Sequence, residues 1–154
     1  MLAADKHAAL LNDLIRINND RIAGYDTALA HLPVGEKVVH ELFENLREES
    51  VRFREELIFR VATLDEKVAA DSTFSGKIFR TWMELKTALK GTDTQAIVES
   101  CAVGEAAWQK AYQTVLEEGT GLPPESHLLI EEQYRAGRNS ALMLEKCRKL
   151  LALP

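Results

Sequence analysis

The sequence has little of what marks several classes of protein. It contains only two cysteines, Cys101 and Cys147, among 154 residues. Two thiols do not make the disulfide framework of a small secreted domain. No apolar run approaches the roughly 20 residues that a membrane-spanning helix needs, and the first residues lack the pattern of a signal peptide. We therefore expect a cytoplasmic protein without a membrane partner.

Basic residues are also in short supply. Lysine and arginine number 19 against 24 aspartates and glutamates, which gives a formal net charge of -5. A nucleic-acid-binding face needs an excess of positive charge, and so does attachment to an anionic lipid surface. We therefore expect neither kind of partner. The length and the 46% hydrophobic content predict a single domain, residues 1–154, with a core of its own.

What the sequence does have is helical periodicity. Residues 11–32 read LNDLIRINNDRIAGYDTALAHL, with apolar residues spaced alternately by four and three, which keeps them on one helix face. Similar stripes predict three more long helices. The first helix begins near residues 3–5 and ends near 31, and the others cover about 34–64, 94–118 and 124–151. A polar residue interrupts the middle of each stripe: Asn18, Glu49, Glu105 and Gln133.

The lengths of the connections predict the topology. Only a few residues around Pro33 and Gly35 join the first two helices, so these must pack antiparallel, with positions 18 and 49 at one level. Residues 65–93 are a far longer connection than a hairpin needs. They can return the chain along the bundle and leave the second and third long helices parallel. A short helix over about 74–89 is expected inside this crossover, with Trp82 on an apolar face suited to association.

Several stretches carry a family resemblance: NNDRIAGYDTAL (18–29), FRTWMELKTALKG (79–91), GEAAWQKAYQTVLEE (104–118) and LPPESHLLIEEQY (122–134). They resemble a bacterial family of ferritin-like four-helix-bundle proteins without an assigned function. More distantly, LN at 11–12 followed by Tyr25 resembles the first helix of bacterioferritins. The resemblance implies an all-α, ferritin-like four-helix bundle, in which two antiparallel hairpins are joined by a long crossover that carries an extra short helix.

The resemblance also raises the question of a diiron centre. Such bundles use a glutamate on each of two helices and Glu-x-x-His on the other two. Here Asn18 stands in the first helix, and Arg52 replaces the histidine after Glu49. The fourth helix offers Gln133, or Glu132 one position off the core face. The four histidines are predicted near helix ends, away from the bundle's middle: His7, His31, His40 and His127.

These residues allow two interpretations. In the first, the interruptions form a buried polar layer in which Arg52 pairs with Glu49, because a buried carboxylate needs a partner. Its members are Asn18, Glu49, Arg52, Glu105 and Gln133. In the second, three glutamates form a degenerate site for iron, manganese or zinc: Glu49, Glu105 and Glu132.

The function expected from the sequence follows the first interpretation. No catalytic motif is recognisable, and the iron ligands are incomplete. We predict a non-enzymatic, stress-associated, ferritin-like protein without a cofactor, acting through self-association as a dimer or through a protein partner. The alternative is a metal-binding ferritin-like protein that keeps the degenerate carboxylate site.

Overall fold

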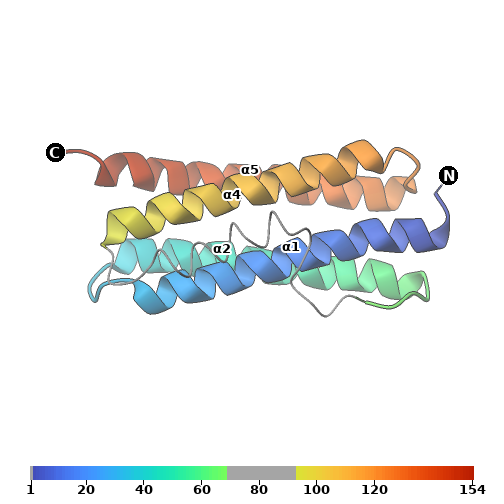
Figure 1. The fold of residues 1–154 in the computed structure, drawn as a ribbon, viewed down its shortest axis with the longest axis horizontal. Helices are drawn as coiled ribbons and strands as arrows, with labels where there is room; N and C mark the ends of the chain where they lie inside the picture. Colours follow the sequence, from blue (N-terminus) through green and yellow to red (C-terminus); the bar gives the residue numbers. More distant parts are fainter. Residues whose placement is uncertain (1, 69–92) are drawn as a thin grey trace.

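The computed structural model of the chain describes residues 2–68 and 93–154. Four long helices make up the described bundle (Figure 1): α1 (Ala4–His31), α2 (Lys37–Thr63), α4 (Thr94–Glu118) and α5 (Pro124–Leu151). These confirm the four long helices predicted from the stripes, with ends that differ by at most three residues. The predicted short helix over 74–89, with Trp82, lies outside the described residues.

Local sequence explains where the helices begin and turn. The Asp93 side chain accepts a hydrogen bond from the Ala96 backbone N–H at 2.9 Å and so caps the start of α4. Pro124 is the first residue of α5, where a missing N–H costs nothing. Gly35 has a φ of 98° in the turn between α1 and α2, a conformation that favours glycine. These tight turns make both hairpins antiparallel.

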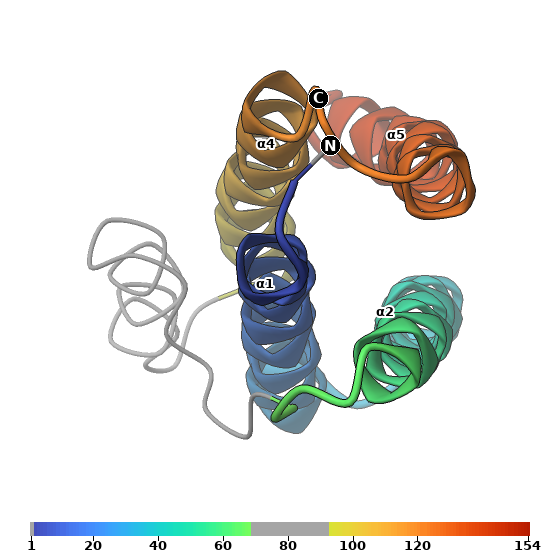
Figure 2. The same cartoon turned by 90° about the vertical axis from the view of Figure 1, so that its right-hand side faces the viewer.

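The two hairpins are joined as the connection lengths predicted. Figure 1 shows α2 and α4 running in the same direction, each antiparallel to its own hairpin partner. Seen from the end in Figure 2, the helices stand at four corners, and α1 packs against α2 and α4 while α5 packs against α4 and α2. This arrangement confirms the all-α, ferritin-like bundle with its long crossover.

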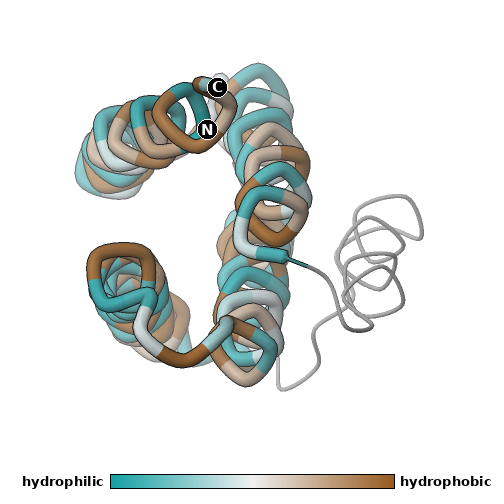
Figure 3. Tube along the Cα trace, turned by 90° about the vertical axis from the view of Figure 1, so that its left-hand side faces the viewer, coloured by the Kyte–Doolittle hydropathy of each residue, from teal (hydrophilic) through white to brown (hydrophobic). Residues whose placement is uncertain are grey.

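The apolar core has two parts, one towards each end of the bundle. One cluster includes Leu11, Leu57 and Val115, and the other includes Phe43 and Leu144. Figure 3 shows hydrophobic and hydrophilic residues alternating along the helices, as amphipathic packing requires. The polar interruptions of the stripes lie between the two clusters, at the waist of the bundle. None of the four described helices combines the length and hydrophobicity needed to cross a membrane.

Candidate functional site

The structure buries four of the five residues expected in the polar layer. Relative exposure is 0% for Asn18, 7% for Glu49, 2% for Glu105 and 2% for Gln133. Arg52, by contrast, is exposed. The prediction that it belongs to the buried layer and neutralises Glu49 there is therefore wrong, because its position on α2 points it away from the core.

Glu132 is exposed as well, one position from the buried Gln133 on α5. It lies outside the layer that contains Glu49 and Glu105. The three candidate metal ligands are therefore not gathered in one buried set. The two remaining carboxylates need a different partner from the one predicted.

That partner is Arg21 of α1, a residue missed by the sequence analysis. Its side chain is completely buried and reaches two other helices. Arg21 Nε donates to Glu105 Oε1 at 3.0 Å, and both terminal nitrogens donate to Glu49 Oε1 at 3.1 Å. One of those nitrogens also donates to Ser50 Oγ at 3.0 Å. A single guanidinium thus ties α1 to α2 and α4 through charge-assisted hydrogen bonds.

The surroundings hold Arg21 in its charged form. Burial disfavours the cation, but the carboxylates of Glu105 and Glu49 outweigh that effect and raise the pKa of Arg21 above its ordinary value. The guanidinium carbon also lies 5.0 Å from the centre of the Trp108 ring, within cation–π range. The layer therefore contains a permanent buried cation between two carboxylates.

Asn18 is the centre of a second group of hydrogen bonds in the layer. Ser50 links this group to Arg21. Its Nδ2 donates to the Leu14 carbonyl and to the Tyr112 hydroxyl, both at 2.8 Å. Its Oδ1 accepts from Trp108 Nε1 at 3.1 Å and from Ser50 Oγ at 2.9 Å. Both amide hydrogens and both oxygen lone pairs are therefore in use. An amide committed in this way is a structural element rather than a free ligand.

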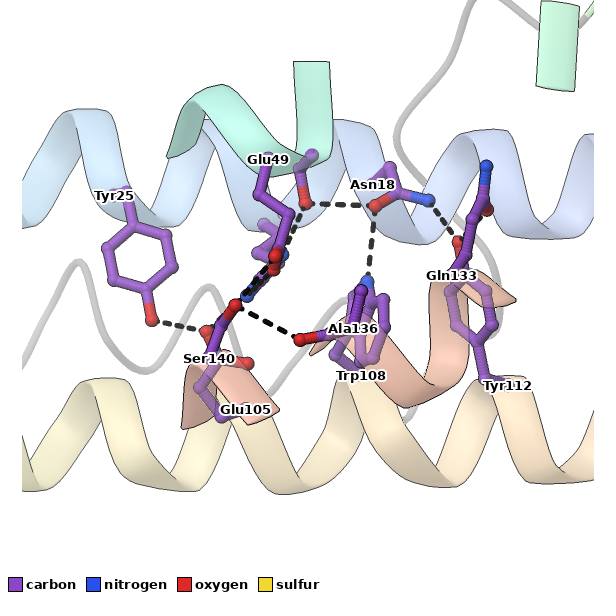
Figure 4. Close-up of polar contacts among 11 residues, drawn as sticks. Asn18, Tyr25, Glu49, Glu105, Trp108, Tyr112, Gln133, Ala136 and Ser140 are labelled. Carbon is purple, nitrogen blue, oxygen red and sulfur yellow. Dashed lines mark hydrogen bonds and ion pairs between the residues drawn. The ribbon is translucent and has the colours of Figure 1, made fainter. Parts of the chain in front are cut away.

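The layer continues into α5 through two contacts (Figure 4). The Tyr112 hydroxyl donates to Gln133 Oε1 at 2.7 Å, and Ser140 Oγ donates to Glu49 Oε2 at 2.6 Å. On the α1 side, the Tyr25 hydroxyl donates to Glu105 Oε1. Burial, followed by the charge of Glu105, raises the pKa of Tyr25 well above its ordinary value, so it remains a donor. All four described helices thus contribute to one hydrogen-bonded network.

Two surface grooves reach this network. One, of about 420 Å³, lies between α2 and α5 over Glu49 and Ser140. The other, of about 270 Å³, lies between α4 and α5 and includes Glu105 in its lining. Glu105 Oε2 is buried and has no hydrogen-bond partner among the described residues. The other three oxygens of Glu49 and Glu105 accept hydrogen bonds from Arg21, Tyr25 or Ser140.

These residues do not fit a diiron centre. The two glutamates share the Arg21 guanidinium, and the Asn18 amide is fully hydrogen-bonded. His7 lies near the start of α1 and contacts Ser126 instead of the layer. Across residues 2–68 and 93–154, no three His, Cys, Asp or Glu side chains group in a way that could hold a metal ion. The layer has the chemistry of an internal salt bridge.

A weak signal for Arg21 was present in the sequence. Position 21 lies four residues after Ile17 and four before Tyr25, and both of these are fully buried. Residues spaced by four share a helix face, so Arg21 falls on a face that is apolar above and below it. Arginine is mostly exposed in folded proteins, and the two carboxylates that allow Arg21 to be buried come from other helices.

Comparison with solved structures supports the fold. A mutant Dps1 of Mycobacterium smegmatis is similar over 96% of this chain and 99% of its own, with 18% identity and a TM-score of 0.81. A DPS protein of Vibrio cholerae O1, described as a member of a broad superfamily of ferritin-like diiron-carboxylate proteins, is similar over 93% of this chain and 89% of its own. Its identity is 17% and its TM-score 0.73. At these identities the likeness concerns the fold.

Comparison with sequences identifies the family. No curated protein matches the chain. One family model, described as a domain of unknown function, matches residues 6–118 and thus covers α1 from its third residue, α2 and α4, as well as the connection between the hairpins. That is well over half of the 154 residues. The expected membership of a ferritin-like family without an assigned function is confirmed: the chain belongs to the family DUF2383.

Proposed function

We propose that this chain is a non-enzymatic, single-domain protein of the ferritin-like fold, in which Arg21 takes the place of metal ions at the waist. The observation that carries the proposal is the buried guanidinium, bonded to both Glu49 and Glu105. In this view the protein acts through its surface, by self-association or by binding a protein partner. The waist holds the helices in register and carries out no redox chemistry.

A guanidinium and a metal ion compete for the same carboxylate oxygens. Oε1 of each glutamate already accepts from Arg21. Two unit charges about 4 Å apart repel by about 4 kcal/mol at an effective dielectric constant of about 20. A divalent ion placed beside Arg21 would face about twice that repulsion. Metal binding at the waist is therefore disfavoured while Arg21 holds its fully buried position.

The surface offers support for association. Val103 of α4 and Leu142 of α5 are each 60% exposed, and Met143 beside it is 54% exposed. Leu142 and Met143 are neighbours in α5, and adjoining exposed apolar side chains favour contact with another protein. We propose a homo-oligomer, with a dimer as its smallest form. A cytoplasmic location and a stress-associated role complete the proposal, and the net charge of -5 argues against nucleic-acid and membrane partners.

Metal binding is the second candidate function. The partnerless Glu105 Oε2 favours it, together with the fold shared with a member of a diiron-carboxylate superfamily. In this alternative Glu49 and Glu105 would hold iron, manganese or zinc as a degenerate site after Arg21 moves aside. The two candidates differ in metal content, which can be measured directly.

The deciding experiment is elemental analysis of protein purified without a metal-affinity tag. The chain is equilibrated with ferrous iron, manganese or zinc in separate samples and then dialysed. We expect far less than one metal ion per chain. About one ion per chain, lost in Glu49→Ala/Glu105→Ala but kept in the exposed control Glu132→Ala, would establish the metal-binding alternative. The wild-type value decides by itself if the double variant does not fold.

Light scattering after size-exclusion chromatography tests association separately. The expected mass at high micromolar concentration is that of a dimer or a larger assembly. Leu142→Ser/Met143→Ser should reduce the mass if that apolar surface takes part, whereas Glu132→Ala should leave it unchanged. A wild-type monomer at every concentration would reject self-association and leave the partner-binding form of the proposal.

A further inference from the structure

An exposed apolar strip follows the side of the bundle that α2 and α5 share (Figure 2). Leu42 and Met143 are among the residues that line the groove between these two helices. Val38 lies one turn before Leu42 and Leu150 two turns after Met143, so both continue the same helix faces. Val38 is 79% exposed, Met143 54% and Leu150 69%. These four residues form the α2–α5 strip, and adjoining exposed apolar side chains mark a contact site.

The two halves of the strip lie at the same level of the bundle. Ser140 Oγ donates to Glu49 Oε2 across the α2–α5 contact and marks one common level. Since α2 and α5 run in opposite directions (Figure 1), residues before Glu49 lie beside residues after Ser140. Val38 precedes Glu49 by eleven residues, which is about 16 Å of helix. Leu150 follows Ser140 by ten residues, which is about 15 Å.

Opposite charges lie beside the strip, one on each helix. Glu41 of α2 and Lys146 of α5 are both exposed, and neither side chain has an ion pair or hydrogen bond within residues 2–68 and 93–154. Glu41 precedes Glu49 by eight residues, and Lys146 follows Ser140 by six. The difference of two residues is about 3 Å of helix rise. An unpaired acid and an unpaired base therefore lie at one level on two neighbouring helices.

We propose that two copies of this chain form a closed dimer through the α2–α5 strip, with the twofold axis parallel to the bundle. In this arrangement α2 of each copy lies on α5 of the other, and Glu41 faces Lys146 of the partner subunit. Twofold symmetry makes the same contact twice. The inference rests on the self-association proposed above and specifies its interface.

Charge distinguishes this dimer from the other symmetric one. A twofold axis perpendicular to the helices would place α2 on α2 of the other copy. Glu41 would then approach a stretch that exposes Glu44 and Glu48 as well as a second Glu41, and like charges across an interface oppose association. With the axis parallel to the bundle, opposite charges meet, and Val38 is covered by Leu150 of the partner subunit. The α2–α5 strip is thus complementary to a second copy of itself.

Sedimentation equilibrium of charge-reversed variants tests the arrangement on the intact chain. Glu41→Lys places two cations at each contact, and Lys146→Glu places two anions there. Each variant alone should raise the dissociation constant of the dimer about tenfold or more. An equimolar mixture of the two variants should regain the wild-type dimer, because each contact then joins a cation and an anion. Stronger association of Glu41→Lys alone would indicate α2 on α2 and overturn the proposal.

A second pair of variants tests the apolar part of the strip. Val38→Ser/Leu150→Ser should also weaken the dimer about tenfold or more, because the apolar centre of an interface is lost. Leu128→Ser removes a side chain that is 55% exposed near the other end of α5 and should associate as the wild type does. A monomeric wild type would reject the self-association on which the inference rests. A wild-type dimer that none of these variants weakens would reject the α2–α5 strip alone.

Discussion

Two polar clusters join the helices of this bundle, and they differ in how they treat positive charge. The waist cluster contains the cation Arg21 with Glu49 and Glu105, all buried. The end cluster contains His7 and Ser126, with Arg60 beside them. His7 Nε2 lies 2.7 Å from Ser126 Oγ, and Arg60 donates to the same oxygen at 3.3 Å. Each cluster thus buries a basic side chain: Arg21 at the waist, which is always charged, and His7 at the end, which can titrate.

The pKa values move in opposite directions in the two places. The carboxylates raise the pKa of Arg21 despite its burial. Burial, and then the charge of Arg60, lower the pKa of His7. Burial alone therefore does not decide whether a cation is tolerated. Buried acceptors from two other helices are needed, and the waist has them.

Replacing Arg21 should have the largest effect. Arg21→Met keeps much of the side-chain volume but leaves two buried carboxylates without their cation. Breaking a buried ion pair on one side typically costs about 3–5 kcal/mol of unfolding free energy, which urea denaturation at pH 7 would measure. Manganese should then stabilise Arg21→Met more than it stabilises the wild type, since the carboxylates become available. A loss below about 1 kcal/mol would show that the waist does not depend on this pairing.

Crowding the waist through Gly137 should have the next largest effect. A Cβ added there would lie 2.1 Å from the nearest Trp108 ring atom, so the ring would have to move. Moving it disturbs the bond from Trp108 Nε1 to Asn18. We expect Gly137→Ala to lose about 1–3 kcal/mol by overpacking, against a gain of up to ~1 kcal/mol in helix propensity.

The matched control for Gly137→Ala is Asn139→Ala, at an exposed position of the same helix. It should be neutral or slightly stabilising, because only helix propensity changes there. Denaturant titration of both variants measures the difference. Equal stabilities would show that the α4–α5 contact can widen without cost.

The contrast between Arg21 and Arg52 shows what sequence reasoning could reach. Apolar periodicity and connection lengths correctly predicted the long helices and the parallel α2 and α4. They also led to four of the buried polar residues, because a polar residue inside an apolar stripe is visible in one dimension. Arg52 was chosen as the partner of Glu49 because it lies three residues away on the same helix. The true partner, Arg21, is 28 residues away and reaches Glu49 across a helix interface, a distance that periodicity does not encode.

Lowering the pH should weaken the end cluster through His7. The pKa of His7 is lowered in the folded state, so the unfolded chain takes up the proton first as the pH falls below ~6.5, the ordinary histidine value. The stability that neutral His7 provides is complete above that pH and is lost as the pH falls through the folded pKa. His7→Gln should show a flatter stability curve between about pH 7.5 and 5.5. The other three histidines, His31, His40 and His127, are present in both proteins and therefore do not affect the difference between the curves.

The measurement for His7 is the unfolding free energy of both proteins at several pH values and constant ionic strength. The wild-type curve should fall more steeply towards acid than the His7→Gln curve. Parallel curves would mean that His7 is equally protonated in the folded and unfolded chains. That result would remove the contrast with Arg21.

Removing Arg52 should have the smallest effect, although it lies on the same helix as Glu49. Its side chain is exposed and lines the rim of the groove over Glu49. Exposed charges contribute little, so Arg52→Ala should change the unfolding free energy by no more than about 0.5 kcal/mol.

A double-mutant cycle gives the sharper test: the coupling of Arg52 with Glu49 should be near zero, and that of Arg21 with Glu49 should be large. A coupling above about 1 kcal/mol for Arg52 would mean that its charge reaches Glu49 through the groove. The waist would then have two cations for its two carboxylates, and Arg21 would not be their sole counter-charge among the described residues.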